Sequence, residues 1–459
     1  MTAAATTATV HQAYRFALDP TPRQQGRLAS HAGAARFAFN WGLELVKRRL
    51  DERAAGGQVE VPWTLAALRR EWNRAKDQVA PWWADNSKEA YSSGLDGLAR
   101  ALKNFADAKQ GRRKGAKIGF PRRKRKGRAR DGCRFTTGAI RVEADRHHVT
   151  LPRLGRIRTH ESTRKLARRL EHATARILSA TISRQGGRWH VGFTCEVHKA
   201  VRGPRQPGAR VGVDVGIRHL AVLSDGRQVP NPAPLDAALR ELRRRNRRLA
   251  RRAGPIAADG TRREPSKGWV GAQQQLGRAH ARVANQRRNA LHHLTTELAA
   301  SYGTVVVEHL NVAGMVGNRR LARHIADAGF GELRRQLGYK TAWAGGTLVQ
   351  ADTFYPSSKT CSGCGYAKAK LPLAERTYRC ECCGLVVDRD LNAARNLAQL
   401  VVAVAGSGPE TQSARGADVR PGQAGQTAVN REAGTSPSGL GETGTVGAEA
   451  PAARIADTR

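Results

Sequence analysis

The spacing of apolar residues along the chain changes several times, and each change predicts a different kind of element. Residues 13–18 (AYRFAL) alternate well enough for a short strand. Two prolines end this run, and apolar residues then recur every three or four positions through Leu28–Leu43, about 63–77 and about 86–108. We interpret these three stripes as the core of a helical bundle.

Residues 133–201 have a different pattern, with short runs of alternating apolar and polar residues separated by frequent turns. The last run contains Gly186-Gly187, which predicts a hairpin because glycine adopts positive φ at little cost. Short strands at regular intervals are typical of a small barrel or sandwich, and the strand at 13–18 can complete it. The helical region would then be an insertion. Cys133 and Cys195 are interpreted as small apolar fillers.

A linker at 203–208 precedes a second region, in which two buried strands each contain an acid. Asp214 lies within the apolar run RVGVDVG, and Glu308 lies near the end of TVVVEHL. An unpaired buried carboxylate is costly, so these acids predict either structural salt bridges or a functional site. Gly212 and Gly216 flank the first acid and let a backbone or a ligand approach closely, which favours a site.

Helical patterns fill much of the chain between and after these strands. A very basic helix is expected at 235–252, with eight arginines and one acid between residues 240 and 252. A second helix at about 273–300, a third at about 331–344 and a strand at 347–352 follow. A duplex backbone would neutralise the first of these helices.

Two Cys-x-x-Cys-Gly knuckles separated by fifteen residues contain Cys361, Cys364, Cys380 and Cys383. This spacing predicts a four-thiolate zinc site. Because four thiolates leave no open coordination position, the zinc is expected to be structural rather than catalytic. Cys382 offers an alternative pairing with Cys380, although Cys-x-x-Cys-Gly geometry favours Cys383.

A third acid, Asp390, follows the last thiolate at the start of a further helical stretch. Asp388 competes for the same position, but Asp390 comes directly before the helix opening Asn392-Ala393-Ala394 and is preferred. Carboxylates from two strands and one helix start can converge to hold two Mg²⁺ ions roughly 4 Å apart. Asp214, Glu308 and Asp390 therefore predict a magnesium-dependent nuclease centre.

The 459-residue chain is strongly basic, with a formal net charge of +41 from 79 Lys and Arg against 38 Asp and Glu. Such an excess predicts nucleic acid as the partner, with a membrane surface as the weaker alternative. Residues 109–130 contain twelve Lys or Arg and no acid, which favours an arm over phosphates rather than a solvated loop. No run of 18 apolar residues exists, which excludes a membrane-spanning protein.

The two ends of the chain and its cysteines bear on location. The first residues lack the layout of a signal peptide, and five of the seven cysteines lie between Cys361 and Cys383. A reducing cytosol with a metal site fits this better than disulfides, and we expect a cytoplasmic, nucleoid-associated protein. Residues 407–459 contain five arginines and six acids but no aromatics, which predicts a disordered tail.

With these motifs the chain resembles the TnpB family of transposon-encoded RNA-guided DNA endonucleases, relatives of the type V CRISPR effectors. The resemblance covers nearly everything up to about residue 400. It is carried by YRFALDPTPRQQ, ARFAFNWGLEL, GVDVGIRHLAVLSDG, HARVANQRRNALHHLTTELA, VVVEHLNVAGM, SSKTCSGCG, CECCG and DRDLNAARN.

The resemblance implies an RNase H-like (RuvC-like) sheet, with Asp214, Glu308 and Asp390 at the family's three catalytic positions. It also implies a guide RNA derived from the transposon end and a double-stranded DNA target beside a short motif that the protein reads. Base pairing would supply the remaining specificity. Two alternatives stay open, a non-catalytic nucleic-acid-binding regulator and an autonomous transposase, although the presence of all three acids disfavours the regulator.

The expected fold is a multidomain α+β or α/β protein. Its expected parts are a wedge-like β-barrel at 1–20 and 131–202, a helical recognition region with a basic arm at 21–130, a RuvC-like nuclease domain with a mixed sheet at 209–356 and 387–405, a zinc-ribbon insertion at 357–386, and the disordered tail at 406–459.

Overall fold

The computed structural model describes the backbone of residues 7–113, 115, 117–254, 265–372 and 374–406. Its described residues form two compact units: one contains those of 7–210, Leu235–Val305 and Leu337–Leu348, and the other contains those of Val211–Pro234, Val306–Gln336 and 349–406. No helix among the described residues has the length and apolar character that a membrane span requires. The tail expected at 406–459 lies outside them apart from its first residue.

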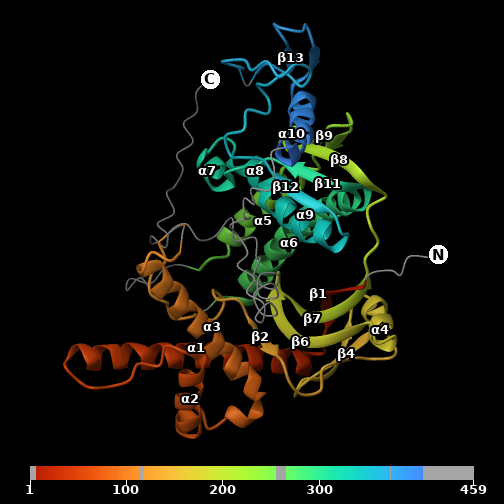
Figure 1. Ribbon diagram of the computed structural model, residues 1–459. Coiled ribbons are helices and arrows are strands. Elements are labelled where there is room, and N and C mark those ends of the chain that lie inside the picture. The colour runs from red at the N-terminus through yellow and green to blue at the C-terminus, as the bar shows by residue number, and fades with distance from the viewer. Residues whose placement is uncertain (1–6, 114, 116, 255–264, 373, 407–459) are drawn as a thin grey trace. The chain divides into compact units, whose positions relative to one another are not determined.

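The three helices predicted near the start are present as α1 (Pro22–Ala54), α2 (Leu65–Val79) and α3 (Lys88–Lys109), with a short 3₁₀ turn η1 (Trp83–Asp85) before α3 (Figure 1). Thr21 begins α1 with a capping box, because its hydroxyl accepts from Gln24 N while the Gln24 side chain accepts from Thr21 N. A Cβ on Gly94 would lie 2.1 Å from Ala35 O, so the backbones of α3 and α1 touch there.

A seven-stranded sheet follows in the same unit, with strand order β2-β6-β7-β1-β5-β4-β3. Its strands are β1 (Thr7–Asp19), β2 (Gly132–Phe135), β3 (Arg141–Val142), β4 (His148–Leu151), β5 (Gly155–Thr159), β6 (Ala175–Gln185) and β7 (Arg188–Ala200). The predicted hairpin is confirmed as β6–β7, with Gly186 and Gly187 both at positive φ. Cys133 and Cys195 lie in its core, as expected.

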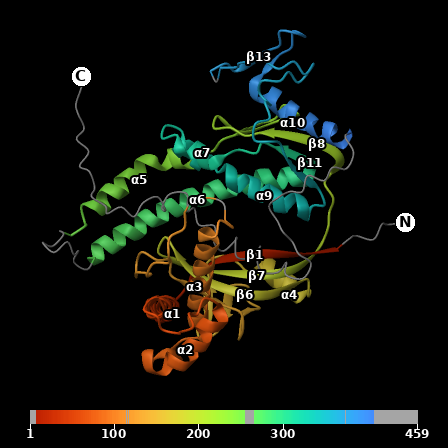
Figure 2. The same ribbon diagram turned by 60° about the vertical axis from the view of Figure 1, so that its left-hand side comes forward.

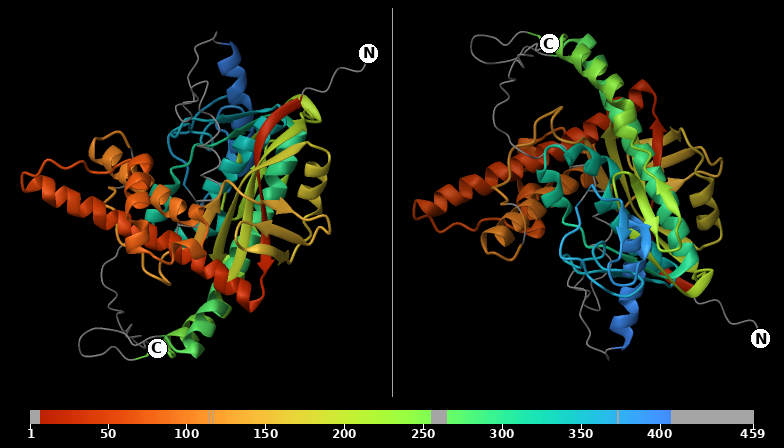
Figure 3. Two further views of the ribbon diagram at one scale, coloured as in Figure 1. Left: turned by 90° about the horizontal axis from the view of Figure 1, so that it is seen from below. Right: turned by 90° about the horizontal axis from the view of Figure 1, so that it is seen from above.

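The N-terminal strand completes this sheet, as predicted, but no closed barrel is found. β1 pairs along eleven positions with β7, from Thr7↔Ala200 to Ala17↔His190, and then with β5 (Figure 3). The described sheet is open, and its edge strands β2 and β3 have only four and two residues. Edges this short offer too few backbone groups to pair with each other. The helix α4 (Arg164–Glu171), which the strand pattern did not predict, follows β5.

A five-stranded sheet has the order β10-β9-β8-β11-β12. Its strands are β8 (Gln206–Asp214), β9 (His219–Leu223), β10 (Gln228–Pro230), β11 (Tyr302–Val307) and β12 (Thr347–Gln350). The basic helix is α5 (Pro234–Ala250), which packs beside α6 (Lys267–Ser301) through Leu242, Ala279 and Val283 (Figure 2).

The remaining elements are short, apart from α9 and the last helix. They are α7 (Val312–Gly317), α8 (Ala322–Ala328), α9 (Phe330–Trp343), the two-stranded ribbon β13 (Thr377–Arg379) and β14 (Val386–Asp388), and α10 (Arg389–Gly406). α10 lies against β9, and the ribbon lies at its N-terminal end (Figure 1). α7 and α8 were not predicted.

Candidate active site and metal centre

Asp214 is the last residue of β8, after the buried residues Val211, Gly212 and Val213. A Cβ on Gly212 would lie 1.9 Å from Ala394 O and 2.6 Å from Ala398 N, so the backbone of β8 touches that of α10. The expectation that a backbone approaches closely at this glycine is therefore confirmed. This contact fixes Asp214 relative to the helix on which Asp390 lies.

Gly212→Ala is expected to destabilise this unit strongly, because both atoms that the new methyl meets belong to the backbone and cannot rotate away. Overpacking of this kind costs about 1–3 kcal/mol or more. Urea unfolding measures the change. Gly208→Ala is the matched control on β8, since a Cβ there meets nothing within 4 Å. Equal unfolding midpoints for the two variants would contradict the close contact.

Glu308 directly follows β11 and is partly buried. Its Oε1 accepts a hydrogen bond of 2.5 Å from the hydroxyl of Ser357, which is 3% exposed. Ser357 lies 49 residues further along the chain, four positions before Cys361 of the first cysteine knuckle. The hydrogen bond restricts the orientation of the carboxylate and leaves the rest of its lone pairs available.

Asp390 lies in the first turn of α10, and its side chain is 24% exposed. The neighbouring Asp388 has a different role. Its Oδ1 accepts hydrogen bonds from the backbone N–H groups of Asp390 (2.9 Å) and Leu391 (3.1 Å). Asp388 therefore caps the helix. Arg376 Nη1 lies 3.9 Å from Asp390 Oδ1.

The three acids interact electrostatically. Burial raises the pKa of Asp214 well above its usual range, and the negative charges of Glu308 and Asp390 raise it further, while Arg389 opposes them. Their oxygens do not form one tight cluster. Among the described residues, the cysteine group is the only set of three or more possible metal ligands whose ligand atoms all lie within 4.8 Å of one another. A cation among the acids would relieve their mutual repulsion.

The cysteine group consists of Cys361, Cys364, Cys380 and Cys383. The Cys361–Cys383 and Cys364–Cys380 Sγ pairs are each 3.6 Å apart. A tetrahedron with Zn–S bonds of about 2.3 Å has edges of about 3.8 Å, so this arrangement fits a structural zinc ion. Cys382 is outside the cluster, in agreement with the preferred pairing.

Local features preorganise these thiols. The glycine after each knuckle, Gly365 or Gly384, has positive φ, which glycine adopts without strain. The backbone N–H of Cys383 donates to the Cys380 sulfur, which lowers the pKa of that thiol to about 6. A thiolate is therefore available for a metal at neutral pH.

Two buried asparagines connect the first knuckle to α10, and the sequence did not single them out. Asn396 Nδ2 donates to Ser357 O (2.7 Å) and Thr360 O (2.6 Å). Asn392 Nδ2 also donates to Thr360 O (2.6 Å), and its Oδ1 accepts from Ser362 N (2.9 Å). The segment 357–362 thus contacts Glu308 through Ser357, α10 through the asparagines, and the cysteine cluster through Cys361.

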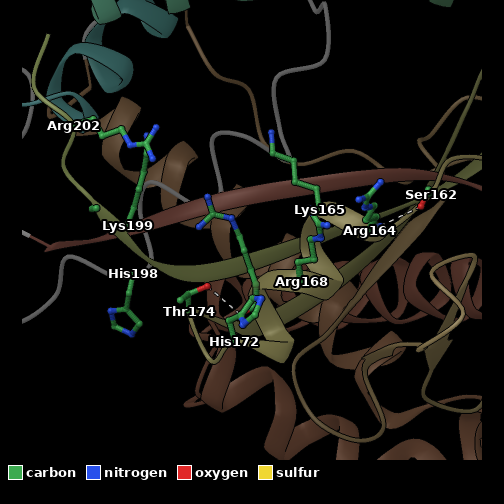
Figure 4. A pocket seen from close by; sticks show the side chains of 11 residues that line it. Ser162, Arg164, Lys165, Arg168, His172, Thr174, His198, Lys199 and Arg202 are labelled. Atoms are coloured by element: carbon green, nitrogen blue, oxygen red, sulfur yellow. Dashed lines mark hydrogen bonds between the residues drawn. The ribbon is translucent and has the colours of Figure 1, made fainter. Parts of the chain in front are cut away.

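A concave, strongly cationic site lies in the other unit. It is a pocket of about 960 Å³ between α4 and the end of β7 (Figure 4). No acid lines it, and nearby Glu171 and Glu196 instead pair with Arg146 (3.4 Å) and Arg176 (3.3 Å). Six of its lining residues have fixed positive charges and no carboxylate partner among the described residues: Arg164, Lys165, Arg168, Arg169, Lys199 and Arg202.

The basic arm expected over phosphates is partly built into the fold. Lys124 Nζ lies 3.9 Å from the centre of the Phe39 ring, and burial lowers the pKa of this lysine. The side chain of Asn40 accepts from Lys124 N and donates to Lys124 O. At least one of the twelve cations is therefore used in packing, whereas neighbours such as Arg122 and Arg123 stay exposed.

Three models of known protein families match parts of this sequence. A family described as "Probable transposase" matches residues 193–319, "Cas12f1-like, TNB domain" matches 330–397, and "Helix-turn-helix domain" matches 9–54. A Mycobacterium tuberculosis protein named "Putative RNA-guided DNA endonuclease" is 41% identical over 449 residues, which is 92% of this chain and 94% of that protein. A "TnpB-like protein" of Acanthamoeba polyphaga mimivirus is 34% identical over 131 residues, 27% of this chain and 24% of that protein.

The chain belongs to the TnpB family. The resemblance stated from the sequence motifs is thereby confirmed. Among solved structures, a Cas12f1–sgRNA–target DNA complex matches 85% of this chain and 99% of its own with a TM-score of 0.46 and 12% identity. The assignment of this chain to the TnpB family rests on the sequence relatives.

Proposed function

We propose that this TnpB family member is a transposon-encoded RNA-guided DNA endonuclease, with a RuvC-like nuclease centre at Asp214, Glu308 and Asp390. The electrostatic coupling of Asp214 to the other two acids is the observation that supports it most directly. The name of the M. tuberculosis relative supports the same function.

The three acids suit divalent magnesium. Carboxylate oxygens are the ligands that Mg²⁺ prefers, and buried carboxylates that repel one another gain most from a cation. Two such ions would supply an activated water and stabilise the leaving oxygen. The chain's own contribution is to hold the acids. Ser357 orients Glu308, and Asp388 caps α10, which leaves the Asp390 carboxylate free of the capping role and able to bind a cation if one were present.

The decisive experiment uses full-length protein with the RNA that copurifies with it. The RNA is sequenced, and a plasmid library containing its complement beside randomised flanks is incubated with Mg²⁺ or EDTA. We expect Mg²⁺-dependent cleavage that requires the RNA and selects a short flanking motif. Joined DNA ends without RNA would instead identify an autonomous transposase, and RNA and DNA binding without cleavage would identify a regulator.

The guide RNA is expected to occupy the cationic pocket between α4 and β7. The pocket concentrates six cations on one concave surface, which suits the closely spaced phosphates of a flexible single strand. Each phosphate held there displaces counterions, so the affinity should fall as salt rises.

Arg164→Ala combined with Arg168→Ala is expected to weaken guide RNA binding and to make it less salt-dependent. Each lost phosphate contact on a single strand lowers the slope of log affinity against log salt by about 0.7. Filter binding between low and moderate salt measures both effects. Arg48→Ala with Arg70→Ala is the control, since both side chains are exposed outside the pocket. Identical slopes for the two double variants would exclude the pocket as the RNA site.

A further inference from the structure

Phe354 is exposed to an unusual degree. Its relative exposure is 93%, whereas the other exposed large apolar side chains among the described residues range from 36% for Trp63 to 54% for Val386. The ring thus contributes little to the packing of the chain on which it lies. An aromatic ring held in water is available to cover another apolar surface.

The backbone around Phe354 is held in place. On one side, the Thr353 hydroxyl and His309 Nδ1 are 2.9 Å apart, and His309 directly follows Glu308. On the other side, Tyr355 packs with the core residues Val306 and Leu397, and its backbone N–H donates to Asp352 O.

The same segment contacts Glu308 a second time. Ser357, three residues after Phe354, donates to the Glu308 carboxylate over 2.5 Å. Phe354 is therefore an exposed aromatic residue on a segment that is hydrogen-bonded to Glu308 itself and to the residue next to it. A strand whose phosphate reaches these acids places its neighbouring bases near this segment.

We propose that Phe354 stacks on an unpaired base of the DNA strand that is cleaved, and so positions the adjacent phosphate at the acids. This inference rests on the proposed nuclease function. Base–aromatic stacking accepts every base, which suits an enzyme whose sequence selection comes from a guide. It also requires a separated strand, because the faces of bases within a duplex are covered by their neighbours. The site thus favours single-stranded DNA over duplex.

The test uses full-length, RNA-loaded protein and target DNA with 2-aminopurine near the cleaved bond, whose fluorescence is quenched by stacking. Binding is read in an Asp214→Asn background and cleavage in single turnovers. Phe354→Leu keeps an apolar side chain without a ring, and Phe354→Trp keeps the ring. Trp63→Leu, on a tryptophan that is 36% exposed and lies outside the ribbon and the segment around Phe354, is the control.

Phe354→Leu is expected to slow cleavage about 10- to 100-fold, in keeping with the loss of one stacked base, and to abolish the protein-induced quenching. Phe354→Trp and Trp63→Leu should retain normal cleavage and normal quenching, and guide RNA affinity should not change in any variant. Full quenching and cleavage in Phe354→Leu would overturn the proposal. Slow cleavage in Phe354→Leu with normal quenching would also overturn it, because the ring would then act in folding. A dimer of the unsubstituted protein that dissociates in Phe354→Leu would overturn it too, because the ring would then contact a second copy of the chain.

The nuclease function and the stacking fail separately. If unsubstituted, RNA-loaded protein cleaves nothing in Mg²⁺, the nuclease function fails, and quenching by single-stranded DNA still decides whether Phe354 stacks. If the unsubstituted protein cleaves and Phe354→Leu cleaves equally well, the nuclease stands and the stacking is refuted.

Discussion

Asp214→Asn is expected to abolish cleavage while the protein becomes more stable. The amide keeps the size of the carboxylate but removes the charge through which a divalent cation would be bound. Loss of about 4 kcal/mol of transition-state stabilisation lowers the rate about 1,000-fold. Single-turnover cleavage in Mg²⁺ measures the loss, and guide RNA binding should not change.

The gain in stability follows from the direction of the Asp214 pKa. Because burial and the neighbouring acids raise the pKa of Asp214 in the folded protein, its ionisation opposes folding as the pH rises through that raised pKa. Without metal, Asp214→Asn should therefore melt higher than the unsubstituted protein at alkaline pH, and the difference should shrink as the pH falls. Asp51→Asn, on an exposed acid of α1, is the control. Cleavage that persists in Asp214→Asn would refute the active-site assignment.

Removal of the Cys361 thiol, one of the four proposed zinc ligands, is expected to have the second largest effect. Cys361→Ser should release the metal and loosen the segment 357–362, which also orients Glu308 through Ser357 and contacts α10 through the asparagines. We expect cleavage to fall at least about 100-fold, since a displaced ligand of the reacting centre has that cost. Zinc content, guide RNA binding and cleavage are measured together, and guide binding should persist.

Asn396→Ala tests the hydrogen bonds between α10 and the first knuckle independently of metal binding. It leaves the carbonyl groups of Ser357 and Thr360 with fewer donors, at a cost of about 1–3 kcal/mol, yet should retain zinc. We expect reduced cleavage with normal zinc content. Gln399→Ala is the control, because this exposed side chain also donates to the knuckle, at Ser362 O, from the same helix. Normal cleavage in Asn396→Ala would show that the ribbon does not position the acids.

Features set by local chemistry could be predicted from the sequence. The Gly186-Gly187 hairpin and the four-cysteine cluster each depend on a few residues at short spacing. Barrel closure could not be predicted in this way, because it depends on whether short strands far apart in the chain pair along their edges. α4 was missed because it is only eight residues long and lies between sequence runs that are typical of strands.

The candidate site was predictable in residue type but not in its connections. Asp214 and Glu308 could be identified as acids within apolar strands. Their role as metal ligands stays a prediction. Ser357 and Asn396 gave weaker signals, because their hydrogen bonds span 49 and 39 residues. The signal for the asparagines was their spacing, four positions apart on a helix, which places both on one face.

The paired asparagines limit how far this protein can be shortened. Excising residues 357–386 to obtain a smaller version would expose or orphan the amides of Asn392 and Asn396, which are 0% and 2% exposed in the intact chain. A compact version would need apolar or helix-favouring residues at both positions, together with a new partner for Glu308. The ribbon is thus part of the framework of the carboxylate centre and is not a detachable module.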